Sequence, residues 1–164
     1  HSMPPLMCNG SVVSSSRIRQ LIQAGEMEQV TALLGRAYGI RGTVVQGMQQ
    51  GQAMGWPTAN LHVPHDRVVP PDGVYVARTV HGVQTYDSIA YIGTRPTFGA
   101  CERLIEVNLL DHTCDLYDQQ ITVQFMARLR GDHTFASVDE LSKQIACDVE
   151  QARSSLRRFS QGVP

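Results

Sequence analysis

Glycine and proline divide the middle of this 164-residue chain into short segments, and this punctuation restricts the possible folds more than any other feature. His81-Gly82 predicts a tight hairpin turn between two of the segments. Short strands separated by turn signals indicate an all-β barrel or sandwich. Five segments have the apolar character or the alternation of such strands: residues 41–46, 74–80, 83–92, 103–110 and 120–129.

Two short helices are expected before the strands. Ser14-Ser15-Ser16 offers an N-cap to a first helix, and Gly25 is suited to end it. A second helix is predicted over Glu26–Leu34, with Gly35 ending it. The two form a helical hairpin that is too small to fold alone. Residues 4–13 are expected to be irregular, and residues 1–3 are interpreted as the remnant of a removed tag.

One long helix is expected at the C-terminal end. Ser137 and Glu140 form a capping box that predicts where it begins. An apolar stripe at helical spacing predicts the face that packs on the strands: Val138, Leu141, Ile145, Val149, Ala152 and Leu156.

Charge and cysteine usage exclude several classes of protein. The formal net charge is -1 and the pI is about 6.6, so no nucleic-acid interface is expected. The four cysteines form no C-x-x-C pair, which favours reduced thiols in a cytoplasmic protein. No apolar run approaches the roughly 20 residues of a membrane span, so no membrane association is predicted.

Three glycines spaced four residues apart precede Pro57, namely Gly47, Gly51 and Gly55. Glycine lets a backbone approach phosphate oxygens closely, and successive N–H groups can bind an anion. The segment is neither a Walker A motif nor a dinucleotide-binding fingerprint. It is either a phosphate-binding loop or a flexible hairpin loop.

Thr58 and Asn60 follow the glycines. Residues two apart on an extended segment share a face, so a hydroxyl and a carboxamide oxygen would point the same way. Such hard oxygen ligands suit Mg²⁺, which takes its charge balance from phosphates. The alternative is a turn or sheet-edge feature.

Further candidates lie on later segments. Glu106 shares a strand face with Asn108 and is either a general base or a solvated, salt-bridged residue. Arg95 is expected in a tight turn, where it would stabilise negative charge or tie down a loop. Phe135, after Arg130, would stack on a planar ligand or pack at the start of the last helix.

Taken together, these motifs resemble the riboflavin kinase family over residues 35–156. The resemblance implies a six-stranded Greek-key barrel with a C-terminal helix, and phosphorylation of the riboflavin 5′-hydroxyl to FMN by ATP and Mg²⁺. The motifs that carry it are Gly35-Arg36-Ala37-Tyr38, Gly55-Trp56-Pro57-Thr58-Ala59-Asn60, Asp72-Gly73-Val74-Tyr75, Ile92-Gly93-Thr94-Arg95-Pro96-Thr97-Phe98, Ile105-Glu106-Val107 and Asp115-Leu116-Tyr117.

The resemblance also implies residue roles. Thr58 and Asn60 would bind Mg²⁺ and ATP phosphate, residues 47–55 would form the phosphate loop, and Glu106 would be the base. Residues 130–135, with Arg130 and Phe135, are similar to the flavin-side wall. The phosphate loop has no basic residue here, so backbone amides, Mg²⁺ and Arg95 would balance the phosphates. Three other positions differ from the family pattern: Asn108 stands where His is frequent, Asp118 where Gly is frequent, and Ala37 where Pro is usual.

The residues before the barrel resemble part of a neighbouring module. Ser14 to Arg19 is similar to the closing signature of the FMN adenylyltransferase module that precedes the kinase in bifunctional bacterial enzymes. The predicted division is therefore residues 1–34, the tail of that module, and residues 35–164, the kinase barrel. The alternatives are a barrel that binds flavin or nucleotide without catalysis, and a structural barrel without a ligand.

Overall fold

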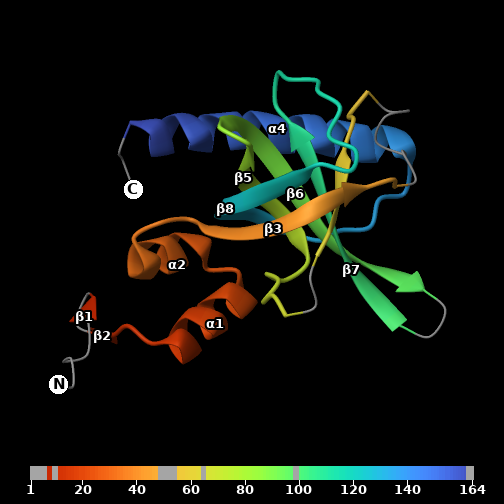
Figure 1. The fold of residues 1–164 in the computed structure, drawn as a ribbon. Helices are drawn as coiled ribbons and strands as arrows, with labels where there is room; N and C mark the ends of the chain where they lie inside the picture. Colours follow the sequence, from red (N-terminus) through yellow and green to blue (C-terminus); the bar gives the residue numbers. More distant parts are fainter. Residues whose placement is uncertain (1–6, 9–10, 48–54, 64–65, 98–99, 162–164) are drawn as a thin grey trace.

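Six antiparallel strands form a closed barrel in the computed structural model, which describes residues 7–8, 11–47, 55–63, 66–97 and 100–161 (Figure 1). Around the barrel the order is β3-β4-β7-β6-β5-β8. The predicted fold class, a mainly β barrel with flanking helices, is confirmed. The strands are β3 Tyr38–Val45, β4 Ala59–His62, β5 Gly73–His81, β6 Gln84–Thr97, β7 Ala100–Leu109 and β8 Gln120–Gly131.

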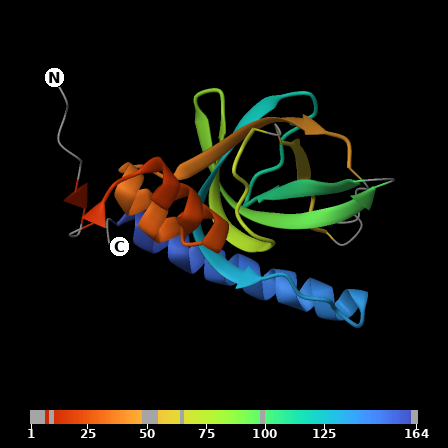
Figure 2. The same ribbon diagram turned by 90° about the horizontal axis from the view of Figure 1, so that it is seen from below.

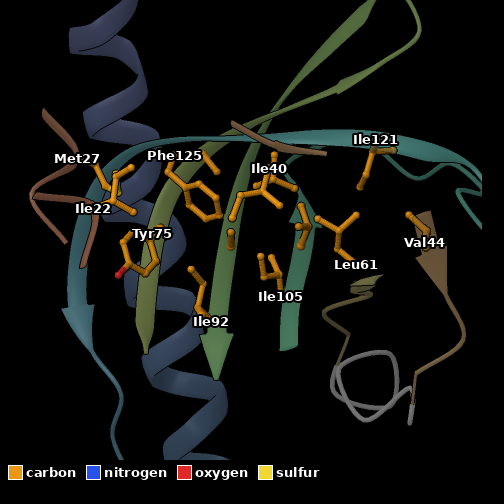
Figure 3. Close-up of a cluster of buried hydrophobic side chains, with 14 of the residues drawn as sticks. Ile22, Met27, Ile40, Val44, Leu61, Tyr75, Ile92, Ile105, Ile121 and Phe125 are labelled. Atoms are coloured by element: carbon orange, nitrogen blue, oxygen red, sulfur yellow. The ribbon is translucent and has the colours of Figure 1, made fainter. Parts of the chain in front are cut away.

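Alternate strand residues fill the barrel, as the twofold period of a strand requires. The rings of Tyr75 and Phe125 meet edge to face in this core, with centroids 5.5 Å apart. The Tyr75 hydroxyl donates to the Pro71 carbonyl at 2.6 Å, so its polar atom is satisfied. Most of the other buried residues of this core are aliphatic, and Figure 3 shows how they meet: Ile40, Val44, Leu61, Ile92, Ile105 and Ile121.

The helical hairpin packs against this core and consists of α1 (Ser15–Ala24) and α2 (Met27–Leu34). Both glycine stops were predicted correctly, because Gly25 and Gly35 adopt left-handed conformations with φ of 81° and 68°. The expectation of an irregular leader was wrong in one respect. Met7–Cys8 (β1) pairs with Ser11–Val12 (β2) as a two-stranded antiparallel ribbon.

The long helix α4 (Val138–Ser160) lies along the outside of the barrel (Figure 2). The Ser137 hydroxyl accepts from the Glu140 N–H at 3.2 Å, as the capping box predicts. The second bond of the capping box differs from the usual pattern. The Glu140 carboxylate accepts from the N–H of Ala136, the residue before the N-cap, at 3.0 Å. The helix contributes Val149, Ala152 and Leu156 to a second apolar cluster between it and the outer face of the barrel, which also contains Val74, Val76, Ile89, Leu110 and Ala127.

The strands β6 and β7 continue further than the sequence predicted. Arg95, expected in a tight turn, lies within β6 opposite Glu102, and the ladder runs on to Thr97 opposite Ala100. The prediction of a turn failed because pairing between β6 and β7 continues through Pro96, which lies opposite Cys101.

Candidate active site

The strand registers align a row of residues across the outer face of the barrel. Asn60 on β4 is the direct partner of Glu106 on β7, and Glu106 is the partner of Tyr91 on β6. The row continues through Val74 on β5 to Arg130 on β8. Directly opposite side chains on one face lie about 5 Å apart at Cβ, so Asn60 and Glu106 are neighbours although 46 residues separate them in the sequence.

Asn60 is buried, at 5% exposure, and its carboxamide oxygen has no hydrogen-bond partner among the residues that the structure describes. A buried acceptor without a partner is costly, so this oxygen is suited to a ligand. The carboxamide lies directly on the backbone of Gly47. A Cβ atom at Gly47 would lie 1.9 Å from the Asn60 amide nitrogen, so any side chain there would displace Asn60.

Thr58 borders a cavity of about 290 Å³ between the start of β4, β7 and the segment that follows β7. The segment is held against β3 because the Asp118 N–H donates to the Val44 carbonyl at 3.0 Å. Asp118 adopts a φ of 58°, the left-handed conformation that aspartate tolerates better than most residues. The cavity walls are largely apolar and include Val44, Pro57, Ala59, Val107, Leu109 and Leu116.

The donor atoms here fit Mg²⁺ better than a softer metal. The Thr58 hydroxyl and the Asn60 carboxamide are hard oxygen ligands, and the Asn60 oxygen is unsatisfied. In the described ranges no group of three or more His, Cys, Asp or Glu side chains could hold a metal. A cation at this position would therefore need further oxygens from water or phosphate.

Tyr91 lies on the other side of Glu106 and was not predicted from the sequence. Its hydroxyl donates to the Asp132 carboxylate at 3.2 Å, joining β6 to the segment that leads into α4. Burial raises the pKa of Tyr91 to about 12, and the charge of Asp132 adds to the effect. The phenol therefore keeps its proton and remains a donor near neutral pH.

Arg130 and Phe135 are brought together at the far end of the row. The Arg130 guanidinium lies over the Phe135 ring, 5.7 Å from its centroid. It also donates to Asp148 of α4, from Nε at 3.0 and 3.1 Å and from Nη2 at 2.8 Å. Asp148 is 2% exposed, and it also accepts from Gln144 at 2.8 Å.

Asp148 was missed by the sequence reasoning, although a signal existed. It falls three residues after Ile145 and four before Ala152, which places a carboxylate on the apolar face of the predicted helix. A charged residue on such a face needs a partner of opposite charge, and Arg130 is that partner.

Three predicted phosphate-binding residues remain, and the structure describes them only in part. Gly55 is exposed with a φ of 80°, and no atom of the described residues lies within 4 Å of a Cβ built on it. Gly51 lies outside the described residues. Arg95 has its backbone in β6, and its side chain lies outside the described part of the structure.

Comparison with known proteins indicates the family of this chain. A family model described as "Flavokinase: Riboflavin kinase" matches residues 34–156. The bifunctional riboflavin kinase/FMN adenylyltransferase of Bacillus subtilis is 36% identical over 151 residues, which cover 90% of this chain and 47% of that protein. The Escherichia coli K12 protein of the same name is 40% identical over 148 residues, which cover 89% of this chain and 47% of that protein. The chain thus spans about half the length of these curated relatives.

Solved structures show the same fold. A Streptococcus pneumoniae structure described as a macrolide-efflux protein has a TM-score of 0.87 and 37% identity, covering 92% of this chain and 50% of that one. Riboflavin kinase from Trypanosoma brucei is 23% identical with a TM-score of 0.53. The match covers 73% of this chain and 80% of that one, and it shows likeness of fold. Across the described residues of the present chain, no helix is long and apolar enough to cross a membrane. Since the family model spans most of the chain, this protein belongs to the riboflavin kinase family, the enzymes that phosphorylate riboflavin to FMN.

Proposed function

We propose that this chain transfers the γ-phosphoryl group of ATP to the 5′-hydroxyl of riboflavin, with Glu106 as general base and Thr58 and Asn60 as Mg²⁺ ligands. One observation carries the proposal. The buried Asn60 carboxamide oxygen, which accepts no hydrogen bond from the described part of the chain, belongs to the residue directly opposite Glu106. A phosphate-binding group and a proton acceptor thus come from adjacent strands, as transfer to a hydroxyl requires.

The nucleotide side of the site is supported by the cavity beside Thr58. Its apolar walls and volume of about 290 Å³ suit the base and sugar of a nucleotide, with the phosphates directed toward Thr58 and Gly47. Bound Mg²⁺ would neutralise charge that develops on the phosphates. Gly51, Gly55 and Arg95 are proposed to complete the phosphate-binding loop.

The acceptor side is supported by the row from Glu106 to Arg130. Riboflavin bound beside Glu106 and Tyr91, where α4 does not cover the face, would place its terminal hydroxyl at Glu106 and its ring system toward Phe135, against which a planar ring stacks. Arg130 would hold that wall in place through Asp148.

In the reaction, the riboflavin oxygen forms a bond to the γ-phosphorus while the bond from that phosphorus to the β,γ-bridging oxygen breaks. Glu106 accepts the hydroxyl proton, and ADP leaves with the bridging oxygen. The residues mainly position the two substrates and stabilise charge, so few protein groups are needed.

The names of the relatives support a larger natural protein. We propose that an FMN adenylyltransferase module precedes this barrel and uses the FMN that it makes. Cys114 and Cys147 are exposed free thiols, which supports a cytoplasmic location.

The test is FMN formation by the chain incubated with riboflavin, ATP and Mg²⁺, followed by chromatography with fluorescence detection. We expect an FMN peak that disappears when ATP or Mg²⁺ is omitted. Riboflavin binding without FMN would instead favour a non-catalytic flavin-binding barrel, and the absence of both would favour a structural role.

A further inference from the structure

The ladder between β4 and β7 ends beside the proposed metal ligands. Its last registered pair is Ala59 with Val107, and one more step of the same register would place Thr58 opposite Asn108. The residue before Thr58 is Pro57, which has no N–H to donate to a ladder. Another contact must therefore hold the chain at this point.

The Asn108 side chain makes that contact. Its amide nitrogen donates to the Pro57 carbonyl at 2.7 Å. Asn108 is 8% exposed, and on its other side its backbone pairs with Ile89 of β6. The amide is thus fixed within the sheet, and Pro57 is fixed to the amide.

The location of Asn108 links the two halves of the site. It lies two residues after Glu106 on the same face of β7, and the carbonyl that it binds immediately precedes Thr58. We propose that Asn108 is a positioning residue, which holds the segment with Thr58 and Asn60 in place for Mg²⁺-nucleotide relative to the strand with Glu106. This inference rests on the proposed function.

Loss of the hydrogen bond from Asn108 to Pro57 should affect nucleotide binding and leave riboflavin binding unchanged. Loss of the bond frees the Pro57-Thr58 segment, which borders the nucleotide cavity, while the row from Glu106 through Tyr91 to Arg130 keeps its own strand pairings. Affinity for Mg²⁺-nucleotide should therefore fall, whereas KM for riboflavin should stay near that of the parent chain.

The experiment compares Asn108→Asp with Asn108→His. Aspartate has the same shape but presents an oxygen to the Pro57 carbonyl, whereas histidine retains a ring N–H that can donate to it. Mg²⁺-ADP binding is measured by calorimetry at pH 8, where the imidazole is neutral. Both KM values are measured by FMN formation. Gln84→Glu, an amide-to-carboxylate change at the exposed start of β6, is the matched control.

We expect Asn108→Asp to weaken Mg²⁺-ADP binding about tenfold or more, as one lost hydrogen bond with a buried partner would. Asn108→His and Gln84→Glu should bind like the parent, and KM for riboflavin should be unchanged in all three. Equal binding by the aspartate and histidine variants would overturn the inference, as would an equal rise of both KM values.

Two further outcomes are distinguishable. If Asn108→Asp does not fold, Asn108→Leu replaces it, and Asn108→His must still bind Mg²⁺-ADP more tightly than the leucine variant or the inference fails. If the parent chain forms no FMN, the proposed function fails. The split in Mg²⁺-ADP affinity would then still decide whether Asn108 positions the nucleotide segment.

Discussion

Breaking the ion pair between Arg130 and Asp148 should destabilise the fold substantially, and replacing Asp148 by Asn tests this. Asp148 has a side chain that is 3% exposed, and it receives three hydrogen bonds from Arg130 between 2.8 and 3.1 Å. The variant keeps the shape but removes the charge, and its amide group must face a donor of either Arg130 or Gln144.

The expected loss of unfolding free energy follows from the burial of the two side chains of the pair. Breaking a fully buried pair costs about 3 to 5 kcal/mol. The Arg130 side chain is 24% exposed and regains some water, and asparagine keeps one acceptor, so we expect a loss of about 2 to 3 kcal/mol. For a chain of this length this corresponds to a fall in Tm of about 4 to 12 °C.

The assay is urea unfolding followed by the fluorescence of Trp56, the one tryptophan in the sequence, which packs against the cluster under α4. Asp87→Asn is the control. It removes a carboxylate that is 51% exposed and paired with Arg78, and such a pair contributes about 1 kcal/mol or less. Equal losses of unfolding free energy in the Asp148 and Asp87 variants would refute the reasoning from burial. The Asp148 variant should also raise KM for riboflavin, because Arg130 no longer holds Phe135.

Two other predictions concern the site and the core. Gly47→Ala should displace the Asn60 carboxamide and weaken Mg²⁺-ADP binding about tenfold or more, as loss of a ligand-positioning contact does. Gly131→Ala is the control and should leave this binding unchanged, because its Cβ would meet Arg128 at an ordinary 3.6 Å. Equal affinities of the two variants for Mg²⁺-ADP would contradict the packing argument. Burial raises the pKa of Tyr75 and of Tyr91 to about 12, above the value near 10 of an unfolded chain, so the unfolded state loses these protons first. The free energy of unfolding should be constant just below pH 10 and fall toward pH 12, and a double change to Phe should flatten that fall in urea titrations.

The barrel and its helices were predictable because local signals agree with the final fold. The turns between strands and the helix C-caps at Gly25 and Gly35 depend on local backbone conformation, which is determined by residues that are close in the sequence. The alternation that separated Glu106 from Ile105 and Val107 also proved correct, since the two aliphatic residues lie in the barrel core.

The contacts between distant residues were not predictable in the same way. The bond from Asn108 to Pro57 joins positions 51 apart, and the bond from Tyr91 to Asp132 joins positions 41 apart. Both depend on which strands are neighbours in the closed barrel, and periodicity within one strand carries no information about that. The extension of β6 through Pro96 was missed for a similar reason, because pairing with β7 outweighs a local turn signal.

The account depends most directly on Glu106 as the proton acceptor, and the decisive measurement is kcat for FMN formation by Glu106→Gln. The variant keeps the shape of the side chain but cannot accept the proton, so kcat should fall roughly 10²-fold or more. Mg²⁺-ADP affinity and the urea midpoint should remain those of the parent, and Glu28→Gln, on the exposed side of α2, should leave kcat unchanged. Turnover by Glu106→Gln close to that of the parent would contradict the account.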